Sequence, residues 1–121
     1  MKSIKYLVLI PLMVGCSQPL TETAFQELMD SEWSKVVMDN PVYASSMGDL
    51  SRNTEWSDTS VENIYSDHQH QLNVLAQLQK LETTQFTEEN KVNYSLFKKQ
   101  YENSIEAYAY QTFLIPFSHR G

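Results

Sequence analysis

Two ionisable side chains lie among apolar residues in segments with helical spacing, and they are the first candidates for chemistry. Glu32 lies between Leu28 and Val36 on the apolar face of one such segment, and His68 lies in the middle of the apolar face of a later one. A carboxylate in an apolar core must be paired or protonated. Glu32 and His68 in one core could therefore act as an acid/base pair or supply two ligands to a metal ion.

A structural role for the same two residues is the alternative that we favour. Glu32 and His68 could form a structural pair, or Glu32 could pair with Arg52, because structural ion pairs occupy the same settings as catalytic ones. The metal interpretation predicts that zinc raises the melting temperature and that His68→Ala abolishes the rise. Glu32 and His68 thus remain weak metal candidates, and no catalytic residue is assigned.

The segment Asp67–His70 contains a second histidine, but helical geometry separates the two rings. His68 and His70 point to nearly opposite faces of a helix, so they cannot bind the same ion. His70 is expected to pair with Asp67, three residues earlier, in a solvated contact. The sequence contains neither the HExxH motif of helical zinc proteases nor the GxSxG motif of α/β-hydrolases.

The single cysteine, Cys16, follows a short basic start and an apolar run over residues 6–14. That run is too short to span a bilayer, and its position after Lys2 and Lys5 is typical of a secretory signal. Residues 12–16, Leu-Met-Val-Gly-Cys, resemble the bacterial lipobox, whose cysteine becomes the lipidated N-terminus. We therefore predict a lipoprotein signal peptide at 1–15 and lipidation of Cys16; an ordinary signal peptide with an accidental cysteine is the alternative.

Lipidation predicts where the protein resides. A diacylglycerol together with an N-terminal acyl chain anchors a protein stably, whereas one chain alone is marginal. In such lipoproteins, Ser rather than Asp after the lipidated residue implies sorting to the outer membrane of a Gram-negative cell, and Ser17 occupies that position. The chain is thus expected to face the periplasm and to contact the membrane through its lipid.

Composition indicates one small, acidic domain. The 121 residues carry a net charge of −6, which becomes −8 when cleavage removes Lys2 and Lys5. This charge argues against nucleic-acid binding and against attraction to anionic head groups. A hydrophobic content of 41% is too high for a disordered chain.

The remaining sequence predicts an all-α fold, an antiparallel bundle of about three long helices and one short one. Residues 16–22 are expected to be a lipid-anchored tether, and residues 23–121 a helical region of an incomplete, larger domain. The first helix is expected to be capped by Thr21 or Thr23 (Thr23 with Gln26 as a capping box) and to end before Asn40. A short helix should follow from Pro41 to Gly48. A third helix is expected from Asp58 or Ser60 to about Leu81, and a fourth from Thr87 to about Thr112.

Apolar spacing also predicts which residues face the core. In the first helix the expected face comprises Phe25, Leu28, Met29, Trp33, Val36 and Val37. In the third it comprises Val61, Ile64, Tyr65, Leu72, Leu75 and Ala76.

The fourth helix carries two apolar stripes on nearly opposite sides. One contains Tyr94, Phe97, Tyr101, Ile105 and Tyr108, and the other contains Val92, Leu96, Ala107, Tyr110 and Leu114. A surface helix has one apolar stripe, so a second stripe implies cover on both sides. We expect a missing C-terminal portion or a protein partner against helix 87–112, a dimer interface being the simpler alternative.

Four segments, taken in order, resemble the opening of a large bacterial family, the domain of unknown function 885. They are Trp33, the run Asn40–Asp49 that fits N-P-x-x-A-[ST]-x-x-G-D, the run Asp58–Ser60, and Asn93-Tyr94-x-x-Phe97. Many members of this family are lipoproteins. The resemblance covers essentially all of the predicted mature chain.

The resemblance implies a mostly helical protein several times longer than this chain. It also implies a metallopeptidase-like His/Glu motif far downstream, where zinc would activate a water to attack an amide. This sequence does not contain that motif, so no catalytic residue carries over and no cofactor is expected in this chain. The residues that carry over have structural roles: Pro41 would start a helix, Gly48 would allow a left-handed turn, and Asp49 would cap or pair with Arg52.

Two functions are consistent with the sequence. The first is an N-terminal helical portion of a lipid-anchored, zinc-peptidase-like envelope protein, inert by itself. The second is a complete small helical lipoprotein that binds a partner in the periplasm. A cooperative melt without binding of hydrophobic dye would favour the second function.

Overall fold

The computed structural model describes residues 21–115, so the predicted signal peptide, Cys16 and the last six residues lie outside the described residues. The described chain forms α1 (Glu22–Asp39), α2 (Pro41–Ser46), α3 (Val61–Leu78), α4 (Glu88–Ala109) and a 3₁₀ turn, η1 (Thr112–Leu114). No strand occurs between residues 21 and 115, which confirms the all-α prediction.

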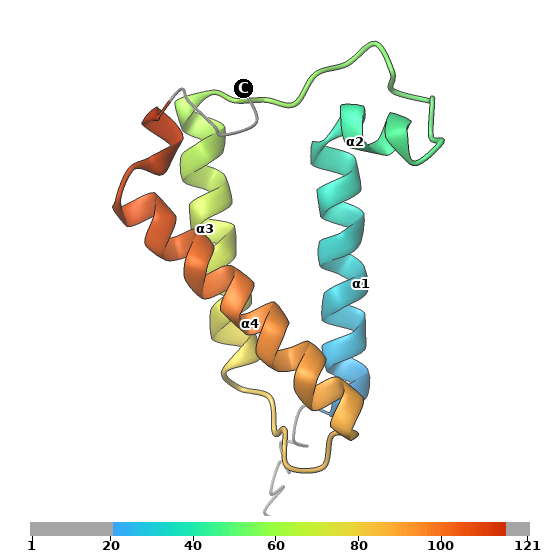
Figure 1. The fold of residues 1–121 in the computed structure, drawn as a ribbon, viewed down its shortest axis with the longest axis vertical. Helices are drawn as coiled ribbons and strands as arrows, with labels where there is room; N and C mark the ends of the chain where they lie inside the picture. Colours follow the sequence, from blue (N-terminus) through green and yellow to red (C-terminus); the bar gives the residue numbers. More distant parts are fainter. Residues whose placement is uncertain (1–20, 116–121) are drawn as a thin grey trace, which may run out of the picture.

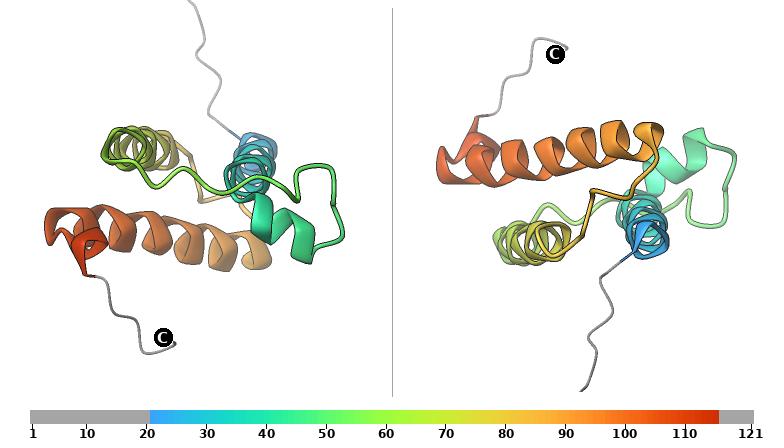
Figure 2. Two further views of the ribbon diagram at one scale, coloured as in Figure 1. Left: turned by 90° about the horizontal axis from the view of Figure 1, so that it is seen from above. Right: turned by 90° about the horizontal axis from the view of Figure 1, so that it is seen from below.

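The three long helices lie side by side at one end of the molecule and separate at the other (Figure 1). α3 and α4 run antiparallel and pack against each other. α1 meets the N-terminal half of α4 and then diverges from the α3–α4 pair, while α2 and the long loop to α3 extend from its far end. Figure 2 shows the same arrangement from above and below, with α1 beside the other two long helices.

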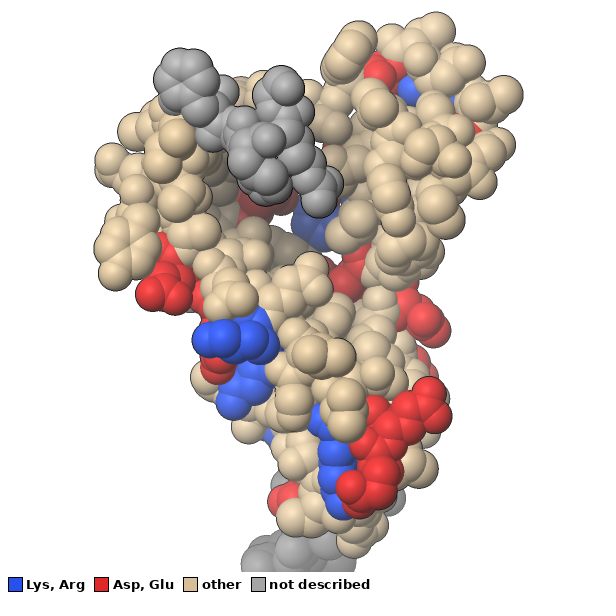
Figure 3. Space-filling model, in the orientation of Figure 1, with Lys and Arg blue, Asp and Glu red and all other residues tan. Residues whose placement is uncertain are grey.

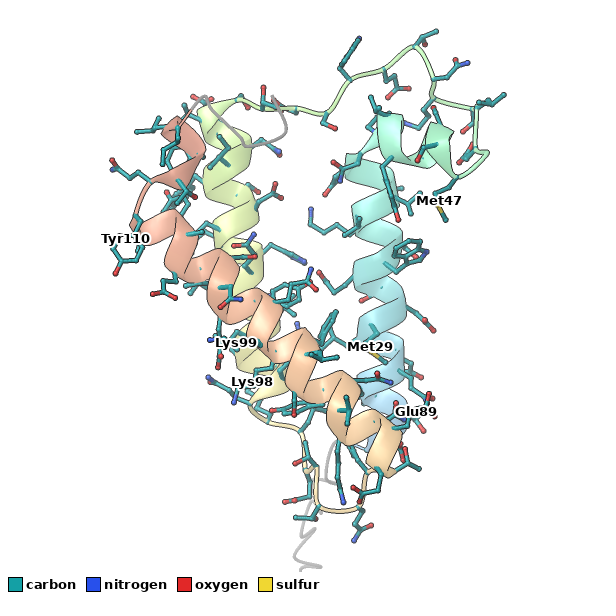
Figure 4. All side chains as sticks on the ribbon, viewed as in Figure 1. Met29, Met47, Glu89, Lys98, Lys99 and Tyr110 are labelled. Atoms are coloured by element: carbon teal, nitrogen blue, oxygen red, sulfur yellow. The ribbon has the colours of Figure 1, made fainter. Side chains whose placement is uncertain are left out.

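The apolar core lies at the end where the three helices meet. Phe25 of α1 is fully buried, and its ring centroid lies 5.6 Å from that of Phe86 and 5.7 Å from that of Tyr94. Val74 and Leu78 of α3 are also fully buried in this cluster. Figure 4 shows Met29 pointing from α1 toward α4 at the same level. This aromatic core holds α1 against the α3–α4 pair.

Local capping explains where two of the helices begin. The Ser60 hydroxyl accepts from the backbone N–H of Asn63 at 3.2 Å, and the Thr87 hydroxyl accepts from that of Asn90 at 3.3 Å. Each bond satisfies a backbone donor in a first helical turn. Both caps agree with the expected ones.

The capping box predicted for Thr23 and Gln26 is wrong. α1 begins at Glu22, with Thr21 as the N-cap residue and no side-chain capping bond, so Thr23 lies inside the helix. The reason is a contact between helices. Glu22 Oε1 accepts hydrogen bonds from the Thr87 hydroxyl at 2.7 Å, from the Thr87 backbone N–H at 3.2 Å and from the Asn90 amide.

Glu22 thereby links the start of α1 to the start of α4. Hydrogen bonds from Thr87 and then Asn90 hold the pKa of Glu22 below its usual value. The N-terminus of α4 carries a partial positive charge, which also favours a carboxylate there.

We expect Glu22→Gln to lower stability at neutral pH, because it removes the charge from these hydrogen bonds. A carboxylate with a lowered pKa contributes stability above its unfolded-state pKa of about 4.5, and this contribution is lost as pH falls through the lower folded value. Urea titrations of the parent chain and the variant from pH 7 to pH 3 should show a difference in the free energy of unfolding that disappears in acid. A difference independent of pH would contradict the role given to the Glu22 carboxylate.

The predicted inward faces are correct in part. Phe25 is buried and Leu28, Met29 and Val37 are half-buried, but Trp33 is 49% exposed and Val36 is 42% exposed. In α3, Ile64 and Leu75 are half-buried, whereas Val61, Tyr65, Leu72 and Ala76 are exposed.

The residues of α3 that face the core are instead Val74 and Leu78, with His70 one turn earlier. The prediction from apolar spacing failed because the face that α3 turns toward α1 is partly polar. On this face His70 lies next to the buried carboxylate of Glu32.

The two apolar stripes of α4 differ in their exposure to solvent. Tyr101 in the first stripe is buried against the core. In the second stripe, Val92 is 58% exposed, Leu96 66% and Tyr110 74%, and Figure 4 shows Tyr110 pointing away from the bundle. Within residues 21–115 the large side chains of this second stripe therefore stay exposed, whereas Ala107 is half-buried.

Leu78 and Leu96 provide a matched test of the core. Leu78→Ala should lower the free energy of unfolding by about 3 kcal/mol, because it removes a fully buried side chain and leaves a cavity. Leu96→Ala should change it by less than about 0.5 kcal/mol, because Leu96 is exposed. Equal losses in urea denaturation would contradict the placement of the core.

Candidate functional site

A polar cleft lies beside the aromatic core, between α1 and the α3–α4 pair. Its volume is about 190 Å³, and its lining includes Glu32, Lys35, Asp67, His70 and Tyr101. Figure 3 shows the molecule hollowed at this level, with acidic and basic side chains at the bottom of the hollow. This cleft is the candidate functional site, because it gathers ionisable groups from three helices.

Glu32 is the centre of the cleft. It is only 7% exposed, and its Oε2 accepts a hydrogen bond from the Tyr101 hydroxyl at 2.7 Å. The Nε2 of His70 lies 2.8 Å from the same oxygen. One carboxylate oxygen therefore joins α1, α3 and α4.

The burial of Glu32 agrees with the sequence, but its predicted partner is wrong. His68 lies two residues before His70 and on another face of α3, where its ring stacks on Tyr108 with the centroids 3.8 Å apart. The structure therefore does not bring Glu32 and His68 together, and the acid/base or metal pair built on them is not formed. The two histidines do point to different surroundings, as helical geometry requires.

Two other expected pairs also differ from the structure. Arg52 binds Glu55 at 2.7 Å and the Met38 carbonyl, so it does not reach Glu32. Asp67 binds Lys35 rather than His70. The reason is that α3 turns Asp67 and His70 toward α1, so that each finds a partner on that helix.

Lys35 bridges two acidic residues at the open side of the cleft. Its ammonium group lies 3.2 Å from an oxygen of Asp67 on α3 and also binds Asp39, one turn along α1. Burial alone would lower the pKa of Lys35, but the hydrogen bonds to Asp39 and Asp67 outweigh burial and leave the pKa raised. Lys35 therefore stays charged and forms a second polar link between α1 and α3.

The cleft does not fit a zinc centre. A catalytic zinc takes three protein ligands, whereas the centre of the cleft offers the Glu32 carboxylate and one His70 nitrogen. Within residues 21–115 no group of three or more His, Cys, Asp or Glu side chains is placed to hold a metal ion. The arrangement acts as a hydrogen-bonded cross-link between helices.

Tyr101 is the partner that sequence reasoning missed. It was assigned only to the inward apolar stripe of helix 87–112, although a tyrosine buried in a core needs an acceptor for its hydroxyl. Burial, and then the hydrogen bond to Glu32, raises the pKa of Tyr101. The signal that could have found the pair was the coincidence of a buried donor and a buried acceptor in two predicted core faces.

A second hollow, of about 350 Å³, lies between α1, α2 and the loop that follows. Trp33, Val37, Met38 and Ala44 form much of its wall, and Arg52 lies at its edge. Trp33 packs edge-on against Tyr43 with the ring centroids 6.0 Å apart. This hollow is more apolar in character than the cleft around Glu32.

The residues that carry the family resemblance build this end of the molecule. Pro41 is buried at the first position of α2, and the Asn40 side chain donates to the Val36 carbonyl at 2.8 Å. Gly48 has a φ of +98°, as expected for a left-handed turn. Asp49 accepts from the Ser51 N–H at 3.0 Å, a bond that lowers the pKa of Asp49.

Asp58 has a comparable role at the start of α3. Its side chain accepts from the Ser60 N–H at 2.9 Å and so supports the residue that caps the helix. Pro41 and Gly48 thus have the structural roles expected of them. Asp49 neither caps a helix nor pairs with Arg52, which binds Glu55 instead.

Large apolar side chains of α1, α2 and the loop that follows remain exposed at this end of the molecule. We call this surface the α2 patch; it comprises Trp33, Met38, Tyr43, Met47, Leu50 and Trp56. Trp56 is 85% exposed, which is unusual for so large a side chain without a partner. The α2 patch and the second stripe of α4 are on different elements.

Comparison with known proteins assigns no family to this chain. No family model, no curated protein and no solved structure matches it. None of the helices within residues 21–115 is long and apolar enough to cross a membrane. The interpretation of the site therefore rests on the contacts of these residues.

Replacing Tyr101 tests the cross-link. Tyr101→Phe should lower the free energy of unfolding by about 2 kcal/mol at neutral pH, because Glu32 stays buried with one donor fewer. A tyrosine with a raised pKa contributes stability below its unfolded value of about 10 and loses it as pH rises further. The difference in the free energy of unfolding between the parent chain and Tyr101→Phe should therefore narrow at alkaline pH.

Tyr110→Phe serves as the matched control, because Tyr110 is 74% exposed and donates no hydrogen bond in the described residues. Urea denaturation at pH 7 and pH 11 measures all three proteins. If Tyr101→Phe behaved like Tyr110→Phe at both values, the cross-link would contribute nothing to stability.

Proposed function

We propose that this chain is the N-terminal helical region of a lipid-anchored bacterial envelope protein of the domain of unknown function 885 family. In this proposal residues 21–115 act as a docking scaffold and not as a catalytic centre. The observation that carries the proposal is where the resemblance lies. The residues that share the family pattern frame the α2 patch and leave its apolar side chains uncovered.

The balance of buried and exposed residues supports a docking role. Within residues 21–115 seven apolar side chains, Pro41 included, are buried, whereas seventeen large apolar ones are exposed. Exposed apolar patches of this kind mark surfaces that another polypeptide covers. We assign the α2 patch to polypeptide that follows in the full-length protein.

The chemistry of the full-length protein belongs to that downstream region. In relatives of the proposed family, zinc held by a His/Glu motif would activate a water molecule. The cleft around Glu32 has a different role in this proposal, since it fixes the angle between α1 and the α3–α4 pair. The position of the α2 patch relative to the other helices depends on that angle.

A complete small lipoprotein that binds a periplasmic partner is the second candidate. It is favoured by the capping of α3 and α4 within the chain and by the Glu22 link, which give these helices their own boundaries. The two candidates differ in the size of the native product and in whether residues 16–121 melt cooperatively without binding hydrophobic dye.

One labelling experiment tests the proposal. Cells that carry the native gene are grown with radiolabelled palmitate, and the product is immunoprecipitated with an antibody against residues 21–115. We expect a labelled band several times larger than a 121-residue chain, located in the outer membrane. Cys16→Ser should abolish the label, and Ser17→Asp should keep the label but move the protein to the inner membrane.

The possible outcomes are distinct. A labelled band at the size of the mature 121-residue chain would replace the first candidate by the second. An unlabelled product would refute lipidation of Cys16 and, with it, the anchored state in both candidates.

A further inference from the structure

The outer face of α4 has an order of side chains that the proposed function does not use. We define the outer stripe as Val92, Leu96, Lys99, Asn103, Glu106 and Tyr110, all of which are exposed. Val92 and Tyr110 are separated by eighteen residues, which is five turns of an α-helix, so they lie on one line along it. Tyr101, which faces the core, lies on the opposite side.

Polarity along the outer stripe is nearly symmetric about Asn103. Val92 and Leu96 form an apolar pair at one end, and Tyr110 forms the other end. Leu96 and Tyr110 each lie seven residues from Asn103. Lys99 and Glu106 flank it with opposite charges.

A surface with this order is complementary to itself under a two-fold rotation. If two copies of α4 run antiparallel with the axis near Asn103, Leu96 of one meets Tyr110 of the other, and Val92 lies one turn beyond this pair. The same rotation brings Lys99 next to Glu106 of the second copy, twice over. A parallel arrangement would instead place Lys99 against Lys99 and Glu106 against Glu106, which is unfavourable.

The surface also has a shape suited to another helix. A shallow hollow of about 480 Å³ lies on α4 between Leu96 and Ala107, with Asn103 and Ser104 in its lining. Small residues at 104 and 107 leave room beside the larger Leu96. Side chains of an opposing helix can enter such a space, as in ridge-and-groove packing.

We propose that the outer stripe of α4 binds the outer stripe of a second copy of this chain in an antiparallel, two-fold symmetric dimer. Such an isologous contact uses one surface twice and closes on itself. It uses a different face from the α2 patch, so it is independent of what covers that patch. α4 is about 33 Å long, and one helix face of that length buries less than a standard interface of about 800 Å² per partner. The dimer is therefore a weak one.

Cross-linking at position 103 tests the geometry. The full chain is expressed with its own leader, extracted in mild detergent and treated with a short bismaleimide. Asn103→Cys places a thiol next to its own copy across the axis and should give a covalent dimer. Asn73→Cys, on an exposed position of α3, is the matched control, and the parent chain with Cys16 alone gives the background.

Charge reversal tests the antiparallel pairing in the Asn103→Cys background. Lys99→Glu and Glu106→Lys should each lower the cross-linked fraction at least about fivefold at low salt, because each places like charges together. The double variant should restore the yield, since it exchanges the two charges. Lys98→Glu makes the same charge change on a face turned toward the Tyr94 ring and should leave the yield unaltered.

Three results would overturn the proposal. The first is a yield at position 103 no higher than at position 73 while a monofunctional maleimide labels both thiols equally. The second is a double variant that stays as weakly cross-linked as the single ones. The third is a Lys98→Glu variant that loses as much yield as Lys99→Glu. Circular dichroism of each variant verifies that its helices are retained.

Discussion

The structure depends on the burial of a single carboxylate. Glu32 is almost removed from solvent, and a carboxylate in that position must receive hydrogen bonds or lose its charge. Its two partners come from different helices, Tyr101 from α4 and His70 from α3. A helix can direct only one of its faces toward a given point. The need to bring Tyr101 and His70 to Glu32 therefore determines how α4 and α3 are rotated about their own axes.

That rotation explains the distribution of apolar side chains. When α3 presents His70 to α1, its neighbours on the other side, including Val61 and Tyr65, face solvent. When α4 presents Tyr101, the opposite face of the same helix, with Leu96 and Tyr110, is turned outward. The rotation that buries the contacts of Glu32 therefore also exposes the apolar faces on the opposite sides of α3 and α4.

Most of the fold follows from local sequence signals, and most of the site does not. Ser60 and Thr87 mark helix starts because a hydroxyl before a helical segment satisfies free backbone donors. Pro41 and Gly48 bound α2 for equally local reasons, one by its fixed φ and one by its access to positive φ. The burial of Glu32 was also predictable, because its apolar neighbours on one helix decide it.

The partners of Glu32 were not predictable in this way. The choice between His68 and His70 depends on how far α3 is rotated about its axis, and that rotation follows from the packing of Val74 and Leu78 in the core between helices. Counting apolar residues favoured the face with Val61 and Tyr65, whereas the contact between helices is settled by Tyr101 and Glu32, which are 69 positions apart. The missed cap at Thr23 has the same cause, since Glu22 binds Thr87 at a separation of 65 positions.

The unequal filling of the space between α1 and the α3–α4 pair has a consequence for local stability. The half of α1 that carries Phe25 is held by ring packing, whereas the half that carries Lys35 is held by ion pairs that water can replace. Local unfolding of α1 is therefore expected to begin at its C-terminal end, so that amide protons near Asp39 exchange with solvent before those near Phe25. The end of α1 that contains Phe25 is therefore held more firmly than the end next to α2. Whatever contacts the α2 patch acts on the less firmly held end.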